Sequence, residues 1–207
     1  MTKDELKKYD FILLMDKSGS MAVRDCIDGV SRWQYAQETV IGVTAKMAEY
    51  DQDGATVGFF ARNLKLYPNI TGSVEQVGKL FSEEEPGGST DTAAALKTVL
   101  DQYFADKASK GPEVKPIIVV VVTDGQPDDK QALRDVIIAA TKKMDADEEI
   151  GISFLQIGND PDAAKFLKEL DDDLVSEGAK FDIVDTKTTE EMANMTITEV
   201  LIAALED

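Results

Sequence analysis

Short apolar runs, each about as long as a β-strand, recur along this chain between segments with helical periodicity. The clearest run is residues 117–122, in which two isoleucines and four valines follow one another without a polar residue. Such a run is typical of a strand buried on both faces, as in a parallel sheet that helices cover on both sides. We predict further strands of this kind at residues 11–15, 56–60, 150–156 and 181–184.

The segments between these runs carry amphipathic stripes. Ala36, Val40, Val43 and Met47 recur at spacings of four, three and four residues, which places them on one face of a helix. Similar stripes predict helices around residues 77–81, 96–103, 133–144, 164–170 and 193–204. The alternation of strands and helices predicts an α/β fold, with a doubly wound, mostly parallel central sheet and helices on both faces.

One strand is expected to break the parallel pattern. Residues 65–67 follow the predicted strand 56–60 after only a few residues. A parallel crossover needs a longer connection, so this short link predicts one antiparallel strand at the edge of the sheet. No linker or repeat interrupts the chain, and its 207 residues suit a single domain spanning 1–207.

The charge balance argues against two classes of partner. Forty acidic and 22 basic residues give a formal charge of −18, which repels phosphate backbones and anionic membrane surfaces. We therefore expect no nucleic acid partner and no membrane partner. The N-terminus has no apolar segment typical of a signal peptide, and a lone Cys26 suits a reducing compartment, so the expected location is cytoplasmic.

The chain contains no histidine. This absence excludes Ser-His-Asp and Cys-His catalysis and removes imidazole as a zinc ligand. Any catalysis would have to use carboxylates, lysine or metal-bound water.

Oxygen-bearing side chains follow the first apolar run directly. Asp16, Ser18 and Ser20 alternate with other residues immediately after the predicted strand 11–15. A buried strand that ends in such a turn brings a carboxylate and two hydroxyls to one point at the rim of the sheet. Hard divalent cations such as Mg²⁺ prefer oxygen ligands of this kind.

Two other polar segments are candidates for the rest of such a site. The sequence Thr-Asp-Thr at residues 90–92 stands behind the glycine pair 87–88, and Thr-Asp-Gly at 123–125 ends the run 117–122. The carboxyl ends of strands in an open α/β sheet form the edge at which ligands bind, near the switch in strand order. All three segments are expected at or near that edge.

In order and spacing, the segments DKSGS, GGSTDTAAAL and VVVVTDG resemble the metal-ion-dependent adhesion site of von Willebrand factor A (VWA) domains. The resemblance covers nearly the whole chain, and it implies a Rossmann-like VWA fold. It also implies five metal ligands, namely Asp16, Ser18, Ser20, Thr90 and Asp124. The implied cofactor is Mg²⁺, with Mn²⁺ or Ca²⁺ as alternatives.

In function, the resemblance implies a binding module and not an enzyme. The cation would accept an Asp or Glu side chain from a protein partner at its open position. Among cytoplasmic relatives, the chain is similar to stand-alone bacterial proteins of the tellurium-resistance type. Similar domains serve AAA+ ATPases and metal chelatases, so an AAA+ ATPase or a stress-response complex is an implied partner.

Each motif also has an alternative interpretation. Asp16 and Asp124 occur where turn residues are common, and Thr90 or Asp91 is suited to capping the helix that follows. For the whole chain, the alternative function is a Mg²⁺-dependent phosphohydrolase that uses Asp16 as its nucleophile. Ser18 argues against that alternative, because such enzymes carry a second acid at this position. A domain that has lost its metal and acts as a scaffold is the third interpretation.

The segment 21–35 is longer than is needed to reach the first helix, and we predict that it overhangs the metal. Asp25 and Asp28 in this segment could cap the site, bind a second cation or be solvated loop residues. Lys17 is interpreted as a solvated surface lysine. The sequence assigns no role to Cys26, and it leaves the identity of the partner and the oligomeric state open.

Overall fold

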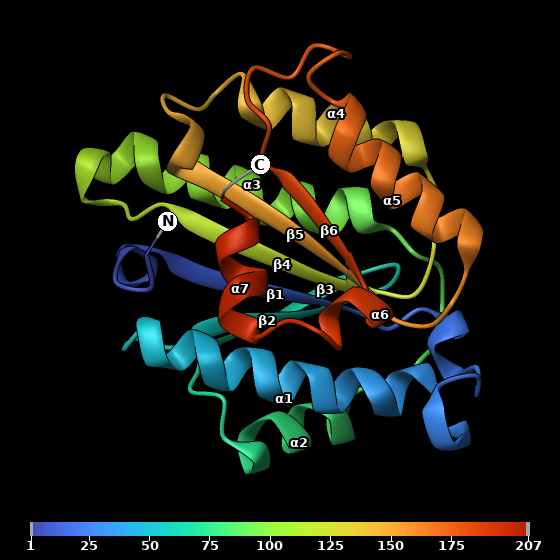
Figure 1. Ribbon diagram of the computed structural model, residues 1–207. Helices are drawn as coiled ribbons and strands as arrows, with labels where there is room; N and C mark the ends of the chain where they lie inside the picture. The colour runs from blue at the N-terminus through green and yellow to red at the C-terminus, as the bar shows by residue number, and fades with distance from the viewer. Residues whose placement is uncertain (1, 206–207) are drawn as a thin grey trace.

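The computed structural model describes residues 2–205 and contains one six-stranded sheet (Figure 1). The strands lie in the order β3-β2-β1-β4-β5-β6, and only β3 is antiparallel to its neighbour. Their bounds are β1 (Asp10–Asp16), β2 (Ala55–Phe60), β3 (Leu64–Ile70), β4 (Ile117–Thr123), β5 (Ile150–Gln156) and β6 (Val184–Thr188). The predicted doubly wound α/β fold with one antiparallel edge strand is confirmed.

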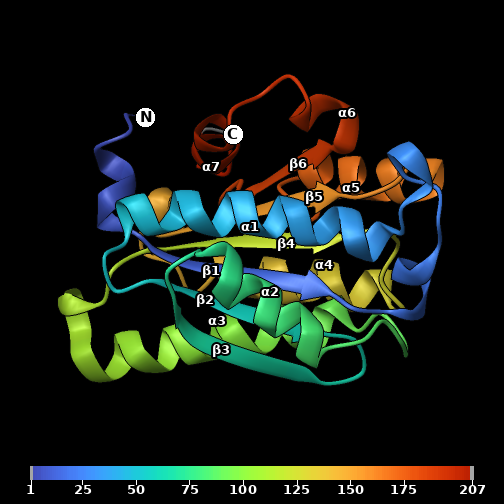
Figure 2. The same cartoon turned by 90° about the horizontal axis from the view of Figure 1, so that it is seen from below.

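Helices cover both faces of the sheet (Figures 1 and 2). On one face lie α1 (Arg32–Tyr50), α2 (Val74–Glu83), α6 (Thr189–Met192) and α7 (Ile197–Ala203). On the other lie α3 (Thr92–Lys110), α4 (Lys130–Thr141) and α5 (Pro161–Asp173). Short 3₁₀ helices complete the chain: η1 (Glu5–Lys8), η2 (Gly19–Ala22), η3 (Ile27–Gly29), η4 (Gly111–Glu113) and η5 (Asp147–Glu149).

The two central strands explain the continuous apolar runs. Every residue of β4 and β5 is buried. Alternate side chains of β4 enter opposite cores: Val120 packs with α1 and α7, whereas Val121 packs with α3 and α4. Because neither face of these strands meets water, neither carries the polar alternation of a half-exposed strand.

Two predicted elements need correction. The last strand begins at Val184 and pairs with β5 through Thr188, so most of the predicted segment 181–184 precedes it. Phe181 and Ile183 owe their apolar character to packing against the α3–α5 core. The strand itself carries mainly polar residues, and the apolar signal therefore marked the chain leading into it.

The last amphipathic stripe was predicted as one helix but forms two. Thr196 starts α7 by a capping box: its hydroxyl accepts a hydrogen bond from the Glu199 amide, while the Glu199 carboxylate accepts one from the Thr196 amide at 2.7 Å. α6 has already ended at Met192, and this cap begins α7 separately. Among residues 2–205, no helix is both long and apolar enough to cross a bilayer.

Candidate functional site

The sheet brings two of the three polar segments together. β1 and β4 are parallel neighbours, and Met15 pairs with Val122, so the residues that follow both strands emerge at one edge. The loop after β1 lies at this edge in both views (Figures 1 and 2). Asp16 and Asp124 are fully buried there, although each carries an ionisable group. Two buried carboxylates at a strand end are expected to have compensating partners.

Asp16 is fixed through both of its carboxylate oxygens. Oδ1 accepts a hydrogen bond from the Ser18 amide at 2.7 Å, and Oδ2 accepts one from the Thr123 hydroxyl at 2.7 Å. Burial raises the pKa of Asp16 to about 6, although these hydrogen bonds act in the opposite direction. The carboxylate thus anchors the turn that carries the two serines.

Ser18, Ser20 and Asp124 form a continuous chain of oxygen atoms. The two serine Oγ atoms lie 3.0 Å apart, and Ser20 Oγ donates to Asp124 Oδ1 at 2.9 Å. Ser18 is nearly fully buried, whereas Ser20 is exposed. The cluster therefore opens to solvent on the Ser20 side. All of its potential metal-ligand atoms are oxygens, which suits a hard cation.

Thr90 is linked to this cluster through the backbone. The Gly19 amide donates to the Gly88 carbonyl at 3.2 Å, which joins the serine turn to the loop carrying Thr90. Within that loop, the Thr90 amide donates to Asp128 Oδ2 at 3.0 Å. The Thr90 hydroxyl makes no hydrogen bond to any of the other four predicted ligands, all of which the structure describes. Asp91 caps α3, because its side chain accepts from the Ala94 amide at 3.0 Å.

A residue that the sequence did not single out occupies the other side of Asp124. The Arg32 guanidinium donates to Asp124 Oδ2 at 2.8 Å and pairs with Asp25 Oδ2 at 2.6 Å. The segment after Ser20 thus folds back beside the cluster through Asp25 and Arg32. No local pattern marks Arg32, since 92 residues separate it from Asp124 along the chain.

Comparison with known proteins decides the family. The sequence profile of the von Willebrand factor type A domain matches residues 10–194. This chain belongs to the VWA family. VWA domains are commonly metal-dependent modules for protein interaction. No curated protein matches the chain in sequence.

Solved structures share the fold of this VWA domain at low sequence identity. The manganese-loaded TRAP protein of Plasmodium vivax is 18% identical with a TM-score of 0.60; the match covers 80% of this chain and 63% of the TRAP chain. The SpRpn10 VWA domain is 11% identical with a TM-score of 0.58, covering 93% of each chain. BatB from Bacteroides thetaiotaomicron is 16% identical with a TM-score of 0.58, covering 96% of this chain and all of its own. At these identities the likeness establishes the fold alone.

The VWA domain holds Lys17 in an ion pair, which corrects its interpretation as a solvated lysine. Its ammonium group donates to Glu84 Oε2 at 2.7 Å, and 26% of the side chain is exposed. Glu84 Oε1 accepts from Lys65 at 2.9 Å and from the Tyr67 hydroxyl at 2.7 Å. A nearly buried carboxylate therefore ties the serine turn to β3. Its partners come from distant segments, which is why no local pattern predicted the pair.

We expect Glu84→Gln to destabilise the domain by about 2 to 3 kcal/mol at pH 7. Burial alone would raise the pKa of Glu84, but hydrogen bonds from Lys17, Tyr67 and Lys65 outweigh it and lower the pKa to about 2. A lowered folded-state pKa stabilises the protein above the unfolded-state pKa. The difference between wild type and variant should therefore shrink as the pH falls from 4.5 toward 2.

Urea unfolding at pH 7, 4 and 3 measures this effect. Glu85→Gln is the matched control, because Glu85 is the adjacent acid and is exposed. Equal destabilisation by the two variants, or a difference that does not depend on pH, would show that the Glu84 ion pairs contribute little.

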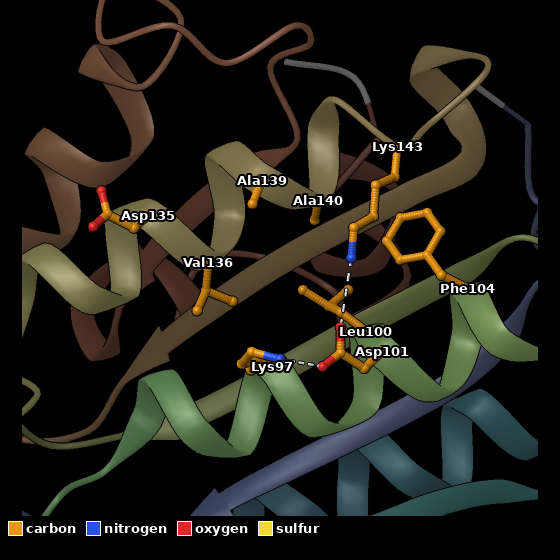
Figure 3. A pocket seen from close by; sticks show the side chains of 9 residues that line it. All are labelled: Lys97, Leu100, Asp101, Phe104, Asp135, Val136, Ala139, Ala140 and Lys143. Atoms are coloured by element: carbon orange, nitrogen blue, oxygen red, sulfur yellow. Dashed lines mark hydrogen bonds and ion pairs between the residues drawn. The ribbon is translucent and has the colours of Figure 1, made fainter.

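A separate groove of about 270 Å³ lies between α3 and α4 (Figure 3). Apolar side chains such as Leu100 and Val136 line it, and Asp101 pairs with Lys97 and Lys143 at its rim. None of the five predicted metal ligands, all of them described by the structure, lines this groove. Within residues 2–205, no three His, Cys, Asp or Glu side chains gather as a metal-binding cluster. The strand-end cluster has two carboxylates, so any cation there would also need hydroxyl ligands.

Proposed function

We propose that this VWA domain is a divalent-cation-dependent protein-binding module that engages an acidic residue of its partner. The proposed adhesion site consists of Asp16, Ser18, Ser20, Thr90 and Asp124. The observation that carries the proposal is the run of oxygen atoms from Ser18 through Ser20 to Asp124, with separations of 3.0 and 2.9 Å. Three oxygen donors from two distant segments converge there at the carboxyl ends of adjacent strands.

These separations suit a small octahedral cation. Mg²⁺ binds oxygen at about 2.1 Å, so neighbouring ligands in an octahedron lie about 3.0 Å apart. The Ser18–Ser20 and Ser20–Asp124 separations of 3.0 and 2.9 Å match this spacing. The proposed cation is Mg²⁺, and Mn²⁺ and Ca²⁺ are alternatives that the same oxygen donors accept.

The balance of ligands supports a binding role. Three of the five proposed ligands are neutral hydroxyls and two are carboxylates. When bound, the cation would supply an electrophilic centre for a carboxylate oxygen from outside the domain. Ser18 and Ser20 would hold it without satisfying its charge, and the exposed Ser20 side would admit the partner.

In this proposal, Thr90 is the residue that responds to the partner. Its loop is bonded to the serine turn through Gly19 and Gly88, while its amide is held by Asp128. The Thr90 hydroxyl would join the ligand set in the partner-bound state. Thr90 is therefore expected to affect partner binding more than the stability of the apo fold.

The alternative phosphohydrolase is less well supported. Enzymes of that kind carry a second acid two residues after the nucleophile, where this chain has Ser18. VWA domains in general are interaction modules without catalysis. That the domain spans residues 1–207 and that it is cytoplasmic stay predictions. So do the likeness to tellurium-resistance proteins and an AAA+ ATPase or stress-response partner.

Affinity capture from an extract of the source cells tests the proposal. We expect a protein partner to be retained on the immobilised domain in Mg²⁺ and released by excess chelator, while the domain stays folded. Thr90→Ala should retain much less of that partner, with a melting temperature close to that of wild type.

Thr98→Ala is the matched control, because Thr98 is an exposed threonine on α3 whose hydroxyl donates only to the Ala94 carbonyl. A partner recovered equally well in chelator, or equally well by Thr90→Ala, would favour a surface scaffold over a metal-dependent module.

A further inference from the structure

We propose that Arg32 acts as an internal cation that weakens metal binding by pairing with Asp124, and that Asp25 holds it in that position. This inference rests on the proposed metal site and concerns how strongly that site binds its ion. The two oxygens of the Asp124 carboxylate face different groups. Oδ1 accepts from Ser20, on the side of the proposed ligands, while Oδ2 accepts from Arg32.

The guanidinium is held in place from three directions. Asp25 accepts from Nε at 2.9 Å and from a terminal nitrogen at 2.6 Å, which is a bidentate pair. Asp124 accepts from the other terminal nitrogen at 2.8 Å. Gly158 lies against the guanidinium so closely that a Cβ there would approach Nε to 2.9 Å. Only 13% of the Arg32 side chain is exposed.

Arg32 compensates part of the negative charge at the proposed site. Asp16 and Asp124 place two negative charges in a buried position, where an unpaired carboxylate is costly. The positive charge of Arg32 partly neutralises the Asp124 carboxylate. Asp25 is 38% exposed and lies on the outer side of Arg32, so it serves mainly to keep the guanidinium in place.

The same pairing must oppose the binding of a divalent cation. Arg32 occupies one oxygen of Asp124, which leaves a single oxygen of that carboxylate facing Ser20. Its positive charge also repels an incoming ion. Repulsion between a monovalent and a divalent charge one ligand apart corresponds to roughly tenfold in affinity even with water-like screening.

The test is a titration with Mn²⁺, in which free ion is counted by electron paramagnetic resonance. We expect Arg32→Gln to bind Mn²⁺ about tenfold more tightly than wild type. Arg32→Lys keeps the charge and should stay near the wild-type affinity. Arg24→Gln is the matched control: it removes the same charge from the same segment, but Arg24 is exposed and bonds only to the Gly29 carbonyl.

The outcomes separate this inference from the proposed metal site. Wild-type binding of Mn²⁺ with no gain in Arg32→Gln, or with an equal gain in Arg24→Gln, would overturn the inference and leave the metal site standing. No binding by any of the proteins would overturn both. If Arg32→Gln unfolds without cation, refolding by Mn²⁺ would support the inference, because the ion would then replace the missing charge. Unfolding that Mn²⁺ does not reverse would overturn it.

Discussion

Mg²⁺ or Mn²⁺ is expected to raise the melting temperature of the chelator-stripped protein by about 5 to 10 °C. An ion that binds only the folded state stabilises it by about 2.7 kcal/mol at a hundredfold excess over its dissociation constant. Ser18→Ala combined with Ser20→Ala should abolish this increment, since it removes two of the proposed ligands. Differential scanning calorimetry with and without cation measures both effects.

The control for this experiment replaces two serines that lie away from the strand ends. Ser82 and Ser109 are exposed helical serines, and each donates to a carbonyl of its own helix. Ser82→Ala with Ser109→Ala should keep the full cation-dependent shift. An equal shift in the Ser18 and Ser20 double variant would place the cation elsewhere in the molecule.

Gly72→Ala is expected to destabilise the domain by about 3 to 5 kcal/mol, the largest effect we predict for a single methyl group. Gly72 has a φ of 73° in the connection between β3 and α2, a conformation that costs L-residues energy. A Cβ at this position would also lie 2.4 Å from the Ala45 backbone in α1. An added Cβ would meet the backbone of Ala45 and not a flexible side chain. The turn that carries Gly72 would therefore have to move away from α1.

Gly78→Ala is the matched control for this prediction. Gly78 lies inside α2, and the nearest atom to an added Cβ is Gln37 Nε2 at 3.8 Å. Alanine in a helix interior gains about 0.5 to 1 kcal/mol over glycine, so this variant should be slightly more stable than wild type. Chemical denaturation of both variants is the measurement. Similar stabilities for Gly72→Ala and wild type would contradict the close approach of α1 to this turn.

Most of the fold could be predicted because its signals are local. The run 117–122 is apolar throughout since β4 is covered on both faces, and the segment 150–156 coincides with β5. The short link before β3 required an antiparallel strand. The predicted position of the last strand was wrong because the apolar residues around Phe181 pack in the chain that leads into that strand. The last amphipathic stripe was predicted as one helix, but a local cap at Thr196 begins a separate helix.

Part of the candidate site could also be predicted from local sequence. Asp16, Ser18 and Ser20 lie within five residues of one another, and Asp124 follows an unmistakable strand, so the sequence by itself determined these candidates and the sheet edge that carries them. Parallel pairing of β1 with β4 then brings the two groups together. Their proposed role as metal ligands stays a prediction.

Only the tertiary structure decided which charges surround these residues. Arg32 pairs with Asp124 across 92 residues, and Lys17 pairs with Glu84 across 67. Such contacts depend on how the loops after β1 and β4 pack against the ends of α1 and α2, and no periodicity or spacing encodes them. The sequence therefore determined the fold and the oxygen donors, because these follow from local patterns. The tertiary structure determined the electrostatic surroundings of the donors, because charges that are distant along the chain meet only after the chain has folded.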